Sequence, residues 1–143
     1  MSVNLFDVNV LLALAWPNHG AHHAAIAWFK VHGLESFATC PITEAGFVRL
    51  SLNSKVVSES KSATAVLDLL ARVLALPNHE FWPDDLPVAT ALGPFSLLAG
   101  HRQVTDAYLL ALAASKGGYL VTMDRKIADA APETMHKSLI VIE

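Results

Sequence analysis

"VNLFDVNVLLALAW", residues 3–16, places one acidic side chain, Asp7, inside a run that is otherwise nearly all apolar. A carboxylate in such a setting costs free energy to desolvate unless something pairs with it, so either a cation meets it there or the strand ends there. Residues 3–8 resemble a short buried strand, whereas residues 9–15 are rich in the helix formers Leu and Ala, and Pro17 ends them. We therefore expect the strand to end at Asp7 and a cation to meet its carboxylate there.

Length and composition predict one domain, residues 1–143. The chain has 53% hydrophobic residues, which is enough for a sizeable core. Its formal net charge is −3, so a polyanionic partner would have to bind to local cationic residues rather than to a surface that is basic overall. The single cysteine, Cys40, excludes an intrachain disulfide and favours a reducing compartment, so we expect a cytoplasmic protein. Pro17 interrupts the first apolar run before it could span a bilayer, so no membrane segment is expected.

Short apolar strands alternate with helical segments along the rest of the chain. Strand patterns cover residues 37–40, 119–124 and 138–143, with a further brief strand within 78–87. Helical patterns cover residues 20–32, 41–53, 60–76 and 104–118, and a short helix follows through 131. Thr105 is the expected N-cap of the helix over 104–118. This order predicts an α/β fold with a parallel sheet covered on both faces, whose ligands bind at the carboxyl ends of the strands.

Four acids are predicted to face that edge of the sheet. Asp7 and Asp124 stand at the carboxyl ends of strands, while Glu44 and Asp106 stand in the first turns of helices. Their carboxylates would repel one another at low local dielectric, and no cluster of Lys or Arg is interleaved with them. A hard divalent cation with oxygen ligands, Mg²⁺ or Mn²⁺, is therefore the expected counter-charge. Such ions activate water and stabilise the attacking and leaving oxygens of an in-line phosphodiester displacement, so the pattern favours a nuclease.

Each acid taken singly also has an ordinary explanation. An Asp at the end of a strand commonly forms a turn, and Asp106 beside Thr105 could simply favour the dipole at a helix N-terminus. Glu44 is the hardest to explain in this way, because it lies on an otherwise apolar helix without an evident local partner.

Four stretches carry a resemblance to a known family. "LFDVNVLLAL", "TEAGFVRL", "VTDAYLLALA" and "LVTMDRKI" closely resemble the four acidic motifs of PIN-domain ribonucleases, in particular the VapC toxins of bacterial toxin–antitoxin pairs. The resemblance spans nearly the whole chain in the expected order. It implies a three-layer fold with a parallel five-stranded sheet, Mg²⁺- or Mn²⁺-dependent RNA cleavage, a homodimer, and inhibition by a small antitoxin protein.

The resemblance also implies roles for single residues. Asp7, Glu44 and Asp106 would be the central metal ligands, with Asp124 as the fourth acid, often acting through water. Asn9 and Thr105 would be polar supports around the site.

Basic and aromatic residues near the motifs suggest further contacts. The nearest cations are Arg49, Arg102, Arg125 and Lys126, of which we expect Arg49 and Arg125 to position RNA phosphates, although a solvated surface role explains them equally well. Trp16, Trp28 and Phe29 either belong to the core or line an apolar groove for an antitoxin helix.

Other functions fit the sequence less well. A receiver-like phosphorelay domain would show paired acids beside the first strand, where this chain has only Asp7. A phosphatase of the haloacid dehalogenase type would have a second Asp where Asn9 stands. The stronger alternative is a PIN-like protein that has lost catalysis and serves only as a binding partner, and the presence of all four acids argues against it.

Overall fold

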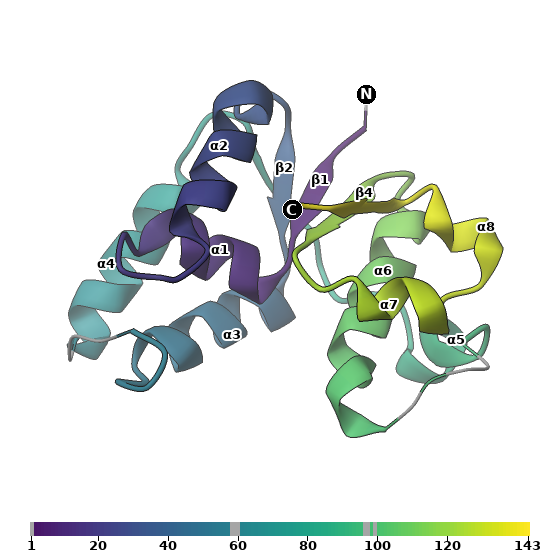
Figure 1. Cartoon of the computed structure of the whole chain (residues 1–143). Coiled ribbons are helices and arrows are strands. Elements are labelled where there is room, and N and C mark those ends of the chain that lie inside the picture. Colours follow the sequence, from purple (N-terminus) through teal and green to yellow (C-terminus); the bar gives the residue numbers. More distant parts are fainter. Residues whose placement is uncertain (1, 58–60, 96–97, 99) are drawn as a thin grey trace.

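A five-stranded sheet forms the centre of the computed structural model, which describes residues 2–57, 61–95, 98 and 100–143 (Figure 1). All strands are parallel, in the order β3-β2-β1-β4-β5. The strands are β1 (Asn4–Phe6), β2 (Phe37–Thr39), β3 (His79–Phe81), β4 (Tyr119–Thr122) and β5 (Leu139–Val141). The predicted α/β fold with a parallel five-stranded sheet is confirmed.

Helices cover both faces of the sheet. In Figure 1 the first four lie on one side and the later ones on the other, which gives the three layers. The first group is α1 (Val8–Ala15), α2 (His22–His32), α3 (Pro41–Ser51) and α4 (Ala63–Leu74). The second group is α5 (Val88–Leu92), the 3₁₀ helix η1 (His101–Gln103), α6 (Val104–Ser115), α7 (Lys126–Ala130) and α8 (Glu133–His136). None of the described helices combines the length and the hydropathy needed to cross a bilayer.

Two hydrophobic cores lie on opposite faces of the sheet. Leu5 of β1 packs into the core that contains the buried residues of α6, whereas its neighbour Phe6 packs into the core that contains Val10 and Val66. Successive side chains of a strand point to opposite faces, so a strand buried on both faces is expected to be largely apolar. This explains why Leu5 and Phe6 are both apolar, whereas the buried Asn4 at the start of β1 donates a hydrogen bond to Glu35 at 2.9 Å.

The helix boundaries correct one prediction. Thr105 does not cap the helix over 104–118: Gln103 occupies the N-cap of α6, and Thr105 is exposed in the first turn. The reason is η1, because its 3₁₀ turn leads directly into α6 and so sets where the helix begins. The helix predicted over 60–76 is α4, capped by the Ser62 side chain, while Ser60 lies outside the described residues.

Two short helices, α5 and α8, occupy segments for which no helix was predicted. Pro87 is the N-cap of α5 and Pro132 is the N-cap of α8, with φ of −61° and −64°. Proline in a sequence predicts a break, but the extended residue immediately before a helix has the φ that proline imposes. The two prolines therefore begin these helices.

The strand register brings the segments with acidic residues to one edge. Phe6 pairs with Val121, so Asp7 and Thr122 follow side by side where β1 and β4 end. α3 also approaches this edge closely, because a Cβ on Gly46 would lie only 2.6 Å from Cγ2 of Val8 at the start of α1. The missing side chain of Gly46 thus lets the helix that carries Glu44 pack against the helix that follows Asp7.

The connection between α6 and β4 is equally tight. Gly117 has a positive φ of 70°, a conformation that glycine adopts without strain. A Cβ on Gly118 would lie 2.4 Å from the carbonyl oxygen of Val3 and 3.0 Å from the ring of Trp82. This connection joins the two segments that carry Asp106 and Asp124.

We expect Gly118→Ala to lower the free energy of unfolding by about 1–3 kcal/mol, because the clash is with backbone that pairs in the sheet and cannot yield. The control is Gly20→Ala, since a Cβ there would meet nothing within 4 Å. Urea unfolding of both variants measures the difference. A Gly118→Ala chain as stable as the Gly20→Ala control would contradict this account.

Candidate active site at the carboxyl ends of the strands

Asp7 links the end of β1 to the start of α1. Its backbone N–H donates to the carbonyl of Val121 at 3.1 Å, and its side chain caps α1 by accepting from the backbone N–H of Val10 at 2.9 Å. Its second carboxylate oxygen accepts a hydrogen bond from the hydroxyl of Thr122. The side chain is 4% exposed, so these donors replace the water that the carboxylate loses. The predicted end of the strand at Asp7 is confirmed.

The Thr122 hydroxyl also fixes the backbone of Asp124. The Asp124 N–H donates to Oγ1 of Thr122 at 3.1 Å, and the Asp124 carboxylate accepts from the backbone N–H of Lys126 at 2.9 Å. Asp124 itself is exposed. A single buried threonine therefore holds one acid directly and the next acid through its main chain.

Asp106 stands in the first turn of α6 and is half-buried. Its pKa is raised from 3.8 to about 6, mainly by burial and in addition by the negative charges of Asp7 and Asp124. Burial is also the largest cause that raises the pKa of Asp7 from 3.8 to about 6; the hydrogen bonds from Thr122 and Val10 lower it, and Asp124 raises it. These three carboxylates repel one another, as predicted for acids that share an edge.

Glu44 has a different set of partners. It lies half-buried in the first turn of α3, where its Oε2 accepts from the Thr39 hydroxyl at 2.8 Å. The same hydroxyl lies 2.8 Å from Nε2 of His79. Burial lowers the pKa of His79, and the charge of Glu44 partly opposes that change. Glu44 therefore interacts with β2 and β3, whereas the other three acids interact with one another.

The described residues do not form a ready ligand shell. No three His, Cys, Asp or Glu side chains among them are grouped so that they could hold one metal ion. Ion pairs between described residues join Lys116 to Asp85 and Arg125 to Glu143, and neither pair includes one of the four acids. None of the Lys and Arg side chains that the structure describes forms an ion pair with Asp7, Asp106 or Asp124.

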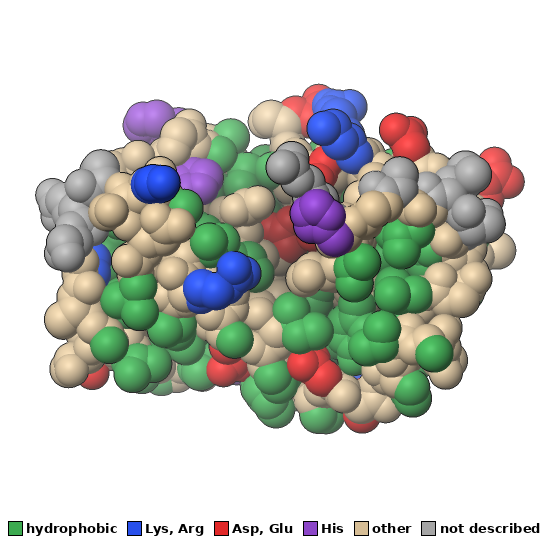
Figure 2. All heavy atoms as spheres, turned by 90° about the horizontal axis from the view of Figure 1, so that it is seen from below, with side chains coloured by type: hydrophobic (Ala, Val, Ile, Leu, Met, Phe, Trp, Pro, Cys, Tyr) green, Lys and Arg blue, Asp and Glu red, His purple; other side chains and the backbone are tan. Residues whose placement is uncertain are grey.

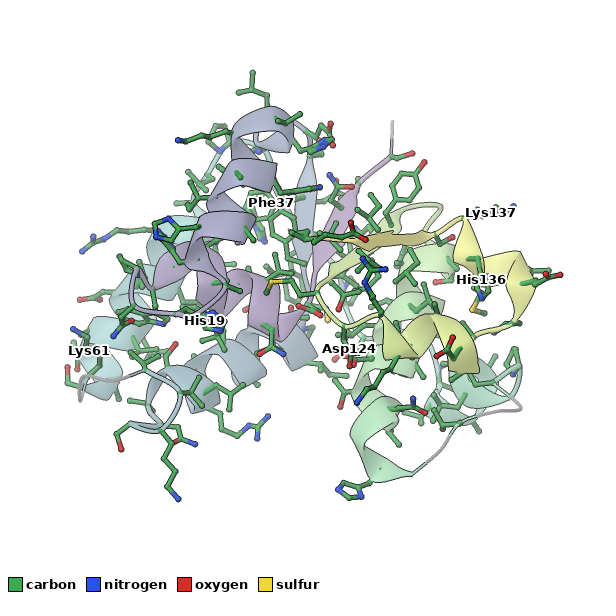
Figure 3. All side chains as sticks on the ribbon, in the orientation of Figure 1. His19, Phe37, Lys61, Asp124, His136 and Lys137 are labelled. Carbon is green, nitrogen blue, oxygen red and sulfur yellow. The ribbon has the colours of Figure 1, made fainter. Side chains whose placement is uncertain are left out.

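An open hollow of about 450 Å³ lies beside Asp124. Asn9, His19 and Asp124 line it, and His19 and Asp124 are labelled in Figure 3 in the α1–α2 and β4–α7 connections. The Nδ1 atom of His19 accepts from the backbone N–H of Ala21 at 3.0 Å. Figure 2, seen from the side of the strand ends, shows acidic side chains recessed near the middle of this face. The geometry offers a hollow in which a substrate could reach the carboxylate of Asp124.

Neither of the two basic residues predicted to position RNA, Arg49 and Arg125, forms an ion pair with the four acids. Arg49 is exposed in the last turn of α3, and Arg125 is exposed and paired with Glu143. The side chain of Arg102 lies outside the described part of the chain. Sequence reasoning missed Thr39, His79 and Thr122 as partners of the acids; the signal for Thr122 was its place two residues before Asp124.

Comparisons with known proteins agree with this architecture. Residues 5–132 match the family model described as the PIN domain. The chain is 48% identical over 128 residues to Ribonuclease VapC39 of Mycobacterium tuberculosis, covering 89% of this chain and 92% of the relative. It is 42% identical over 142 residues to Ribonuclease VapC38 of Mycobacterium tuberculosis (strain ATCC 25618 / H37Rv), covering 96% and 99%.

Two crystal structures share the fold at low sequence identity. One is VapBC2 from Rickettsia felis bound to a DNA fragment from their promoter, with a TM-score of 0.62 and 16% identity over 97% of this chain and 96% of that chain. The other is FitAcB from Neisseria gonorrhoeae, with a TM-score of 0.61 and 21% identity over 96% of each chain.

The pKa of Asp7 makes a prediction about stability. Because this pKa is higher in the folded chain than 3.8, folding favours the protonated carboxyl. The resulting stabilisation is fully present below pH 3.8 and is lost as the pH rises through about 6. We expect Asp7→Asn, which keeps the shape and removes the charge, to raise the free energy of unfolding at about pH 8 by roughly 1–3 kcal/mol, with little change at about pH 4.

Urea unfolding of the chain with chelator present, at both pH values, measures this effect. Asp68→Asn, a change at an exposed carboxylate of α4, is the control and should have no comparable effect at either pH. A lower stability of Asp7→Asn than of wild type at about pH 8 would show that the hydrogen bonds of Asp7 outweigh its desolvation.

Proposed function

Since this chain belongs to the PIN-domain family and its relatives at 48% and 42% identity are VapC ribonucleases, we propose that it is a metal-dependent endoribonuclease and the toxin of a toxin–antitoxin pair. The observation that carries the metal dependence is the mutual repulsion of Asp7, Asp106 and Asp124 at the strand ends. A divalent cation would relieve this repulsion, and an all-oxygen donor set suits Mg²⁺ or Mn²⁺.

The four acids have distinct roles in this proposal. Asp7, Asp106 and Glu44 would hold the cation, and the exposed Asp124 would complete the site from the solvent side. When bound, the ion would activate water and polarise a phosphate oxygen of RNA. Thr122 and the start of α1 hold the carboxylate of Asp7 in place before the ion arrives, so its orientation is set in advance.

Polar and basic residues around the acids would position the RNA. Asn9, which lines the same hollow as Asp124, and Thr105, exposed in the first turn of α6, are the proposed polar supports. Arg49 and Arg125 are the proposed phosphate contacts, and their exposure at this edge leaves them accessible to a polyanion. A chain with a net charge of −3 needs such local cations to bind RNA.

The proposal extends to the cellular setting. The lone Cys40 is buried and unpaired with another cysteine, which agrees with the reducing cytoplasm as the compartment of action. We also propose that residues 1–143 act as one PIN-like domain and that the chain forms a homodimer, the latter on the family resemblance alone.

A groove on the face away from α6 is the proposed site for the antitoxin. It has a volume of about 300 Å³ and is lined by apolar side chains of β1, β2, α1, α2 and α4, including Phe6, Phe29 and Val73, and by Leu76 just after α4. The neighbours named VapBC2 and FitAcB are two-component assemblies by name, which supports an antitoxin as the occupant. An apolar helix face of that partner would fit such a groove.

Of the three aromatic residues considered for the antitoxin groove, one lines it and two make contacts elsewhere in the fold. Phe29 lines the groove, whereas Trp28 packs edge-on to Phe6 and stacks on His32. Trp16 donates a hydrogen bond to the Ser51 hydroxyl at 2.9 Å. We therefore propose that Phe29 contacts the antitoxin helix while the two tryptophans have mainly structural contacts.

We expect the purified chain, free of antitoxin, to cleave total cellular RNA when Mg²⁺ or Mn²⁺ is present and to stop when a chelator is added. Asp7→Asn should reduce cleavage by more than the roughly 10- to 100-fold that changes to supporting residues cost at metal sites, because it removes a ligand. Asp68→Asn, on exposed α4, should retain activity. Gel electrophoresis of the RNA over time measures the rates. RNA left intact by the folded wild-type chain would favour the non-catalytic binding protein.

Expression of the chain alone should arrest bacterial growth, and co-expression of a small protein encoded beside it should relieve the arrest. Leu76→Glu, which places a charge in the groove at a residue 42% exposed, should weaken binding of that protein about 10-fold or more while RNA cleavage continues. Leu52→Glu, at a residue 44% exposed outside the groove, is the matched control. Equal relief of both variants would refute the groove as the binding site.

A further inference from the structure

A hydroxyl at the end of β2 connects an acid of the site to a histidine of the edge strand. Oγ1 of Thr39 lies 2.8 Å from Oε2 of Glu44 and 2.8 Å from Nε2 of His79. Thr39 is fully buried, whereas Glu44 and His79 are half-buried. The three residues come from β2, α3 and β3, so the fold and not the local sequence brings them together.

The chemistry of the three groups decides which of them donates and which accepts in the hydrogen bonds of Thr39. A hydroxyl has one proton to donate, and a carboxylate can only accept, so Thr39 donates to Glu44. With its proton given to Glu44, Oγ1 of Thr39 can only accept from His79, which requires the tautomer that carries the proton on Nε2. In that tautomer a chain of two hydrogen bonds runs from His79 through Thr39 to Glu44. Each bond in such a chain polarises the next and strengthens it.

The imidazole of His79 is held in place by more than this contact. β3 pairs with β2 in register, with His79 opposite Phe37, and the two rings lie 5.2 Å apart between centroids. Just before His79, the Asn78 side chain donates to two carbonyls of the α2–β2 connection, each at 2.9 Å. A ring fixed in this way can orient a hydroxyl.

We propose that Thr39 and His79 are positioning residues that orient the carboxylate of Glu44 for binding the divalent cation. The inference rests on the proposed function, because it assumes that Glu44 is a ligand. Glutamate has several rotatable bonds, and a hydrogen bond to one oxygen reduces its freedom while the other oxygen is available to a cation. The segment around β3, to which the sequence assigned no chemistry, thereby contributes to the site.

The test is Mn²⁺ binding to the full chain without RNA, measured by titration calorimetry. Thr39→Val keeps the shape of the side chain and removes the hydroxyl, so the affinity should fall about 10- to 100-fold. Thr39→Ser restores a hydroxyl and should bring the affinity back close to that of wild type. His79→Leu should also weaken binding, and His79→Gln, which keeps a nitrogen donor near the position of Nε2, should weaken it less.

Matched controls separate this effect from a general one. Thr64→Val changes an exposed threonine of α4, and His136→Leu changes an exposed histidine of α8; neither should alter the affinity. Urea unfolding of each variant checks that it is folded. If Thr39→Val does not fold, His79→Leu on the edge strand carries the test, and unchanged Mn²⁺ affinity of that variant overturns the proposal.

Asp7→Asn, measured in parallel, distinguishes a failure of the positioning role of Thr39 and His79 from a failure of the proposed metal-dependent function. If Asp7→Asn abolishes Mn²⁺ binding while folded Thr39→Val binds as wild type does, the positioning role is wrong and the proposed function stands. Tighter binding by Thr39→Val also overturns it, because the hydroxyl would then hold Glu44 away from the ion. A wild-type chain that binds no Mn²⁺ overturns both.

Discussion

The burial of the Asp7 carboxylate is the constraint on which this fold and its site depend. A charge placed in the middle of an apolar run has to be met by donors, and the chain meets it by ending β1 there, beginning α1 there and placing Thr122 beside it. The parallel register of β1 with β4 brings Thr122 into position, so the pairing of strands far apart in the sequence supports a single side chain.

That arrangement leaves Asp7, Asp106 and Asp124 without an ion pair to any Lys or Arg side chain that the structure describes. Burial and the mutual repulsion of Asp7, Asp106 and Asp124 raise the pKa of two of them to about 6, which lowers the stability of the folded chain at neutral pH. Residues that serve only the fold would be expected to avoid this cost. A cluster that destabilises its own protein is typical of a site whose ligand supplies the missing charge.

Local rules of the sequence predicted much of this architecture, since the alternation of strands and helices determines which residues fall at the carboxyl ends of strands. Asp7, Glu44, Asp106 and Asp124 all lie where those rules put them. The contact of Thr39 with His79 could not be predicted in the same way, because it joins residues 40 positions apart through strand pairing. Thr105 was assigned wrongly as an N-cap because no local signal marks a 3₁₀ turn that continues into a helix.

Two threonines at strand ends explain how acids from both faces of the sheet are held. Thr122 follows Val121, the partner of Phe6, and shares the α6 side of the sheet with Leu120, whereas Thr39 is level with Phe6 on the opposite side. Each is fully buried and donates its hydroxyl to a carboxylate, Thr122 to Asp7 and Thr39 to Glu44. The two hydroxyls lie on opposite faces of the sheet. Glu44 accordingly interacts with Thr39 and His79, whereas Asp7, Asp106 and Asp124 repel one another. An ion bound at this edge would have to take ligands from both sides of β1. The hydroxyl of Thr122 would then hold the ligand on one side, Asp7, and that of Thr39 the ligand on the other, Glu44.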